Sequence, residues 1–91
     1  DYAFLAMANA YLGRTGDAKT AAANVMKLDP TWVAERYLSD GGGYVEKEAE
    51  LLVNGARKAG LPDCVPADKL KDMPNLIRVK SCDEQRAKIT G

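Results

Sequence analysis

The stretch YAFLAMANAYLGRTGDAKTAAANVMKLDP, residues 2–30, decides the fold of this chain. Its beginning predicts a helix over residues 2–12, because apolar residues recur there at intervals of three and four. These apolar residues are Phe4, Met7 or Ala8, and Tyr11. The run 13–16 contains two glycines and ends the helix in a turn. The first element is therefore expected to be a short helix with one apolar face.

A second helix is predicted over residues 18–28, with Asp17 as its N-cap. Its apolar stripe consists of Ala18, Ala21, Ala22, Val25 and Leu28. Small side chains on both helices allow their backbones to approach closely. We therefore expect the two helices to form an antiparallel hairpin.

Two further helices are expected after the hairpin. Pro30 predicts the start of a third helix over residues 31–38, because Pro is favoured at the first helical position. The glycine-rich run 39–43 ends this helix. A fourth helix is predicted over residues 44–59, where apolar residues again follow a helical spacing. Gly60 is the expected C′ residue after its last turn.

Residues 61–91 differ in kind from residues 1–60, to which we assign the helical hairpins. Three prolines and frequent charged residues interrupt this last part. We expect a short helix over residues 66–72, an extended piece over residues 76–80, and a final helix that begins at Ser81. That Ser has capping-box spacing to a Glu three residues later. The expected fold is all-α, with an irregular C-terminal cap.

The composition excludes several classes of function. The 91 residues include 14 Ala, which favour closely packed helices over a sheet with a deep pocket for a small-molecule substrate. Because His is absent, Ser-His-Asp and Cys-His catalysis and His-ligated metals are excluded. The 13 basic and 13 acidic side chains balance, which argues against nucleic-acid binding. No apolar stretch reaches the roughly 20 residues of a membrane span, so direct membrane contact is not expected. We expect no catalytic residue, cofactor or metal.

The segments 8–13, 16–17 and 28–30 (ANAYLG, GD and LDP) resemble the tetratricopeptide repeat. The resemblance implies an α-solenoid in which Ala8 and Tyr11 pack the first helix of a unit onto the second. Further packing residues implied by the resemblance are Ala21 or Ala22 in the second helix, and Pro30, which closes the unit. The repeat's usual Trp near the start is absent here, so the peptide-binding residues of the family are not carried over.

A closer resemblance covers residues 8 to about 62. The phrase Arg-Lys-Ala-Gly-Leu-Pro at residues 57–62 is similar to the end of the C-terminal repeats of bacterial class III adenylate/guanylate cyclases. It implies a non-catalytic interaction or scaffolding segment of a larger signalling protein, whose catalytic domain and two metal-binding Asp residues lie upstream. Because related repeats follow winged-helix regulators, the alternative is the sensor segment of a membrane-spanning transcription regulator.

Cys64 and Cys82 lie 18 positions apart, and the residues leave three states open. A disulfide closing this loop stabilises by roughly 3 kcal/mol and holds the proline-rich tail to the fourth helix. Two free thiols are ordinary in the cytoplasm. A metal site is the least favoured, because there is no His and no Cys-x-x-Cys pair. The state of the two cysteines indicates the compartment of the protein, because a disulfide implies an oxidising space such as the periplasm.

A protein partner, or a second copy of the chain, is the expected ligand, bound through exposed helix faces. Trp32, Tyr37 and Tyr44 flank the third helix and either line a groove for a partner or belong to the core, which we favour. The acidic residues of the fourth helix do not form a catalytic pair, because a spacing of two separates their faces. These residues are Glu46, Glu48 and Glu50, and we expect them on a solvated face.

Overall fold

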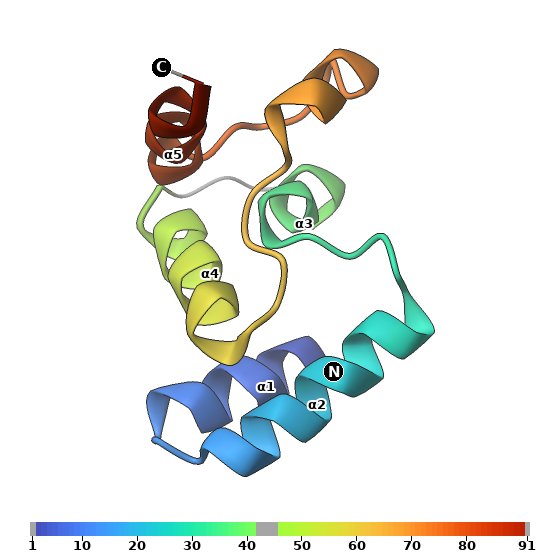
Figure 1. Cartoon of the computed structure of the whole chain (residues 1–91), viewed down its shortest axis with the longest axis vertical. Coiled ribbons are helices and arrows are strands. Elements are labelled where there is room, and N and C mark those ends of the chain that lie inside the picture. The colour runs from blue at the N-terminus through green and yellow to red at the C-terminus, as the bar shows by residue number, and fades with distance from the viewer. Residues whose placement is uncertain (1, 42–45, 91) are drawn as a thin grey trace.

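The computed structural model describes residues 2–41 and 46–90, and these residues form an all-α fold without a strand (Figure 1). The elements are α1 (Tyr2–Tyr11), α2 (Thr15–Leu28), α3 (Ala34–Gly41), α4 (Glu46–Ala59), the 3-10 helix η1 (Ala67–Asp72) and α5 (Lys80–Thr90). The prediction of an all-α fold is therefore confirmed. Within the described ranges, no helix has both the length and the apolar character needed to cross a membrane.

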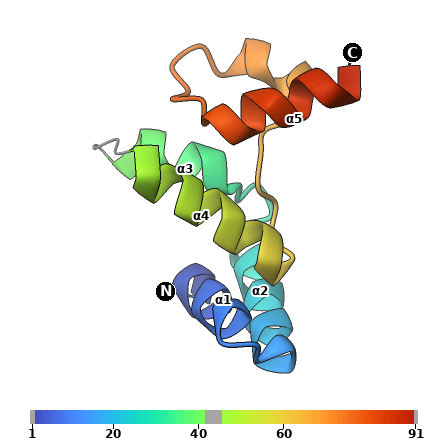
Figure 2. The same cartoon turned by 90° about the vertical axis from the view of Figure 1, so that its left-hand side faces the viewer.

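The helices follow one another along the longest dimension of the molecule, 34 Å. Helices α1 and α2 lie side by side at one end, and α5 lies at the other (Figure 1). Helices α3 and α4 fill the middle, where α4 packs across α1 and also contacts α3 (Figure 2). The segment after α4 runs back past α3 before it reaches η1 and α5.

The α1–α2 contact is built from small side chains. Its fully buried residues include Ala3 and Ala6 of α1, and Ala21 of α2. The expected apolar face of α1 was wrong in part, because Phe4 and Tyr11 are about half exposed, at 50% and 48%. All residues of α1 are uncharged, so charge does not distinguish its faces. The face with the small side chains is buried because it allows the closest approach of α2.

Helix α2 begins at Thr15, earlier than predicted. Asp17 is therefore not the N-cap; it lies in the first turn, where a negative charge is favourable to the helix dipole. The N-cap position is held by Arg14, whose side chain makes no capping hydrogen bond.

Helix α3 begins at Ala34, three residues later than predicted. The Asp29 carboxylate accepts hydrogen bonds from the Thr31 N–H at 3.1 Å and the Thr31 hydroxyl at 2.7 Å, and this local turn competes with helix formation. The first N–H groups of α3 form hydrogen bonds with carbonyl groups outside the helix. Those of Ala34 and Glu35 donate to the carbonyls of the Pro62 and Asp63 residues that follow α4.

Helix α4 ends as the sequence predicts. Gly60 has a φ of +80°, and the Leu61 N–H donates to the Ala56 carbonyl at 2.8 Å, which is the bonding of a Schellman ending. A side chain at position 60 would be strained in this left-handed conformation. The predicted beginning at Tyr44 lies outside the described residues.

The C-terminal part is irregular, and it differs in detail from the prediction for residues 66–91. The short helix predicted over residues 66–72 is η1, and the piece predicted to be extended forms no strand within the described part of the chain. Ser81 lies inside α5, so it is not the N-cap, and the predicted capping box is wrong. Its hydroxyl and N–H both donate to the Glu50 carboxylate of α4, at 3.0 and 3.3 Å. Glu50 is therefore engaged in a contact and not simply solvated.

Candidate functional site

An apolar groove of about 560 Å³ lies between α1 and α4. Its lining residues are Phe4, Met7, Ala8, Tyr11, Glu48, Leu51 and Leu52. The residues from each helix are spaced by three or four positions, so each helix presents one continuous stripe to the groove. Glu48 is the only charged side chain among the described residues that line it. The groove thus offers apolar surface with one acidic group at its edge.

Gly55 allows the two walls of the groove to meet closely. A Cβ atom at this position would lie 3.0 Å from the Met7 sulfur and 3.2 Å from the Cε2 atom of Tyr11. The Tyr11 hydroxyl donates to the Leu51 carbonyl and accepts from the Asn54 amide, both at 3.2 Å. These contacts fix the Tyr11 ring as a rigid wall of the groove.

Much apolar surface on and beside the groove is exposed. Leu5 is 51% exposed, Leu12 68% and Leu51 62%. Helix α1 has no charged side chain on any face. Such helices are typically covered by other elements on several sides. Contiguous exposed apolar surface marks sites of interaction with other proteins. The chemistry of this region is therefore that of a docking surface.

The packing residues expected from the tetratricopeptide resemblance divide into two sets. Ala21, Ala22 and Val25 of α2 are buried in the core, whereas Leu28, the last residue of the predicted apolar stripe, is 73% exposed. Ala8 and Tyr11 were expected against the second helix; they instead line the groove toward α4. Ala3 and Ala6, which are buried in the core, lie on a different face of α1.

The remaining predicted positions are placed as follows. Pro30 lies exposed in the turn before α3 and does not begin a helix. Trp32 is half-buried and packs against the core. The side chain of Tyr37 and all of Tyr44 lie outside what the structure describes, so the aromatic groove remains a prediction. The groove between α1 and α4 was missed, because its α4 wall is separated from α1 by most of the sequence.

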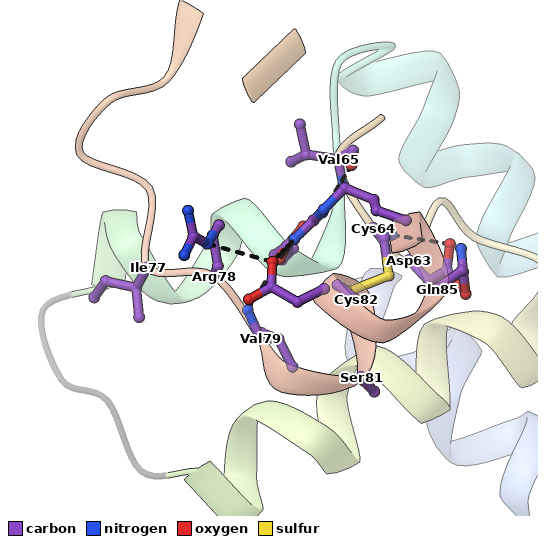
Figure 3. Close-up of polar contacts among 12 residues, drawn as sticks. Asp63, Cys64, Val65, Ile77, Arg78, Val79, Ser81, Cys82 and Gln85 are labelled. Carbon is purple, nitrogen blue, oxygen red and sulfur yellow. Dashed lines mark hydrogen bonds and ion pairs between the residues drawn. A yellow bond between two sulfur atoms is a disulfide. The ribbon is translucent and has the colours of Figure 1, made fainter. Parts of the chain in front are cut away.

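A buried polar cluster joins α3 to α5. The Glu35 side chain is fully buried and accepts two hydrogen bonds from Arg86, at 2.6 Å on Oε1 and 2.9 Å on Oε2. The N–H groups of Val65 and Val79 donate to the same carboxylate, each at 2.9 Å (Figure 3). All these bonds are short and charge-assisted, so the buried charge is fully compensated.

Arg86 has further acceptors around it. Its guanidinium also donates to the Val65 carbonyl and to Asp83, both at 2.8 Å. The hydrogen bonds to Glu35, followed by those to Asp83, raise the pKa of Arg86 well above its usual range. This cluster was not predicted from the sequence. Because every buried side-chain polar atom of the described residues has a partner, its chemistry is that of a structural contact.

Cys64 and Cys82 form a disulfide bridge beside this cluster (Figure 3). The bridge links the segment after α4 to the first turn of α5. Cys82 is fully buried and Cys64 partly so. The Glu35 carboxylate lies within 4.8 Å of both sulfur atoms. Its oxygens are already hydrogen-bonded and the sulfurs are bonded to each other, so this trio has no free ligand atoms for a metal.

An ion pair on the surface completes the attachment of α5. Arg57 of α4 donates to Asp63 at 2.8 Å and to Gln85 of α5 at 2.9 Å. Burial raises the pKa of Asp63, but the hydrogen bonds from Arg57 and from the Cys64 N–H outweigh it and hold the pKa below its usual range. The described residues thus contain an apolar groove between α1 and α4 and a densely bonded cap. Comparison of the chain with protein-family models, curated proteins and solved structures found no match.

Proposed function

We propose that this chain is a non-catalytic protein-interaction segment and that the groove between α1 and α4 is its docking surface. The observation that carries the proposal is the exposure of Leu5, Leu12 and Leu51 on and beside an apolar groove, one wall of which is the uncharged helix α1. Burial of such surface by a partner stabilises a complex by about 25 cal/mol per Å² of apolar area removed from water.

The parent protein that we propose is a bacterial cyclase-type signalling protein. The support is the resemblance of residues 8–62 to the C-terminal repeats of such cyclases, together with an antiparallel hairpin of small-residue helices, α1 and α2. In this proposal the helices are tetratricopeptide-type units that bind a partner, and the cyclic-nucleotide chemistry belongs to a catalytic domain elsewhere in the protein.

The disulfide favours a second candidate. Disulfides persist mainly in oxidising compartments such as the bacterial periplasm. A bridge between Cys64 and Cys82 therefore supports a sensor segment that lies outside the cytoplasm, as in a membrane-spanning winged-helix regulator. The coding sequence on the amino-terminal side of Asp1 distinguishes the two candidate parent proteins. A cyclase domain with two metal-binding Asp residues supports the first; a winged helix followed by a membrane span supports the second.

Site-specific photo-crosslinking in cells tests the docking surface. A photoreactive amino acid at position 51 is expected to give adducts with another polypeptide, because Leu51 borders the groove. The matched control is position 28, since Leu28 is similarly exposed, at 73%, but lies at the end of α2. Equal adduct yields at the two positions, or none at position 51, would contradict the proposal.

A further inference from the structure

We propose that the occupant of the α1–α4 groove is the same groove of a second copy of this chain, in a two-fold symmetric, antiparallel pairing. This inference rests on the proposed function, and it names the partner. A two-fold interface brings one surface patch onto itself, so the patch has to be complementary to its own reversed copy. Both the shape and the charge of the groove meet that condition.

The α1 wall of the groove has an aromatic ring toward each end. The small side chain of Ala8 lies between the larger rings of Phe4 and Tyr11 on the same stripe. When a second α1 runs antiparallel across the first, its Ala8 faces this Ala8, and each ring lies beside a ring of the other copy. The small residue at the centre allows the two helices to approach closely.

Beside the groove, α4 carries charges of opposite sign near the two ends. Glu48 lines the groove together with Phe4, and Lys58 lies with its Nζ atom 5.8 Å from the centre of the Tyr11 ring at the other end. Ten positions separate the two residues in the sequence, which is about 15 Å along a helix. A two-fold axis through the middle of the groove therefore places Glu48 of each copy near Lys58 of the other.

The extent of the apolar surface argues for a macromolecule over a small ligand. Leu5 of α1 and Leu12, which directly follows α1, are exposed but do not line the groove itself. A small molecule in the groove would leave both uncovered. An antiparallel α1 helix from a second copy extends along the whole of α1 and reaches both.

The test is the mass of the 91-residue chain in solution, with its disulfide intact, measured by light scattering across a range of concentrations. At high concentration the expected mass is twice 9.8 kDa. Leu51→Glu is expected to keep the chain monomeric, because it places a charge in the contact. The matched control is Leu28→Glu, which is expected to dimerise like the unaltered chain. Far-UV circular dichroism verifies that each variant is folded.

Charge reversal tests the antiparallel pairing itself. Glu48→Lys alone and Lys58→Glu alone each place like charges together, and each is expected to weaken dimerisation about tenfold, since two symmetric pairs change sign. An equimolar mixture of the two variants is expected to dimerise again, because each then meets its opposite. The doubly reversed chain is expected to recover as well.

Three results would overturn the inference. They are a monomer at every concentration up to the millimolar range, a dimer that Leu51→Glu leaves intact, and a mixture of the two charge variants that associates no better than either alone. If the chain is monomeric while position 51 still crosslinks to a different protein, self-pairing is wrong and the proposed docking function stands. If position 51 also crosslinks to nothing, both are wrong.

Discussion

Glu35 and Arg86, 51 residues apart in the sequence, form a doubly hydrogen-bonded ion pair that is buried between α3 and α5. The pair joins the helical part of the chain to its C-terminal cap. Because the Glu35 carboxylate also accepts the N–H groups of Val65 and Val79, one side chain organises two otherwise irregular segments. These polar bonds act together with the buried side chains of Val65 and Val79 and with the disulfide to order the cap.

Removal of one partner of this pair should destabilise the fold strongly. Arg86→Met leaves the buried Glu35 charge uncompensated, and the expected loss in the free energy of unfolding is about 3–5 kcal/mol. Urea denaturation measures it. Arg78→Met is the control, because Arg78 pairs with Asp83 at an exposed site and should cost less than about 1 kcal/mol. Equal losses in the two variants would refute the structural role of the cluster.

Reduction of the disulfide should loosen the cap first. The bridge closes a loop with a sequence separation of 18, and its loss is expected to lower the free energy of unfolding by about 3 kcal/mol. Hydrogen exchange with and without a reductant locates the effect. Faster exchange is expected in α5, with much smaller changes in α1 and α2. A uniform change over all helices, or none, would show that the cap does not depend on the bridge.

Gly55→Ala should destabilise the chain although Ala favours helices. The helix propensity gained is about 1 kcal/mol, but the new Cβ atom would lie 3.0 Å from the buried Met7 sulfur and 3.2 Å from the tethered Tyr11 ring. We expect the overcrowding to exceed the gain. In a Met7→Ala background the same substitution should cost less, because the sulfur is gone and only the contact with the Tyr11 ring remains. Thermal melts of the four chains give the coupling between positions 7 and 55, and an equal cost in both backgrounds would contradict the overcrowding by Met7.

Protonation of the Asp63 carboxylate at acid pH should weaken the attachment of α5. Its folded-state pKa is lowered, so its contribution to stability is fully present above the unfolded value of about 3.9 and is lost as the pH falls through the folded value. Asp63→Asn is therefore expected to be less stable than the unaltered chain at pH 7 and to lose less stability between neutral and acid pH. Urea midpoints across this range measure both. Parallel profiles for the two proteins would exclude Asp63 as a source of acid sensitivity.

The sequence predicted the helices well where a local signal exists. The ending of α4 depends on Gly60 and its neighbours, and it was predicted at the correct residue. The start of α3 was not, because the Asp29 carboxylate forms a turn with Thr31 that the expected role of Pro30 does not reveal. The first described turn of α3 also depends on carbonyl groups from residues 62 and 63, which are distant in the sequence.

The candidate groove and the polar cluster are harder to predict for a different reason. In α1 every side chain is uncharged, so hydrophobic periodicity does not tell which face is buried. Glu35 and Arg86 carry no sequence pattern that connects them, since neither belongs to a motif. A Gly within the apolar stripe of α4 was the one local signal available, because Gly55 marks the close approach of another helix.

The bridge between Cys64 and Cys82 makes the intervening segment part of a covalent ring. Most of the side chains in that segment, including those of η1, are exposed and accessible to proteases. A single cut between the two cysteines would therefore open the ring without releasing α5. The cut chain would run as two pieces only after reduction, so nicked protein would go unnoticed on a non-reducing gel.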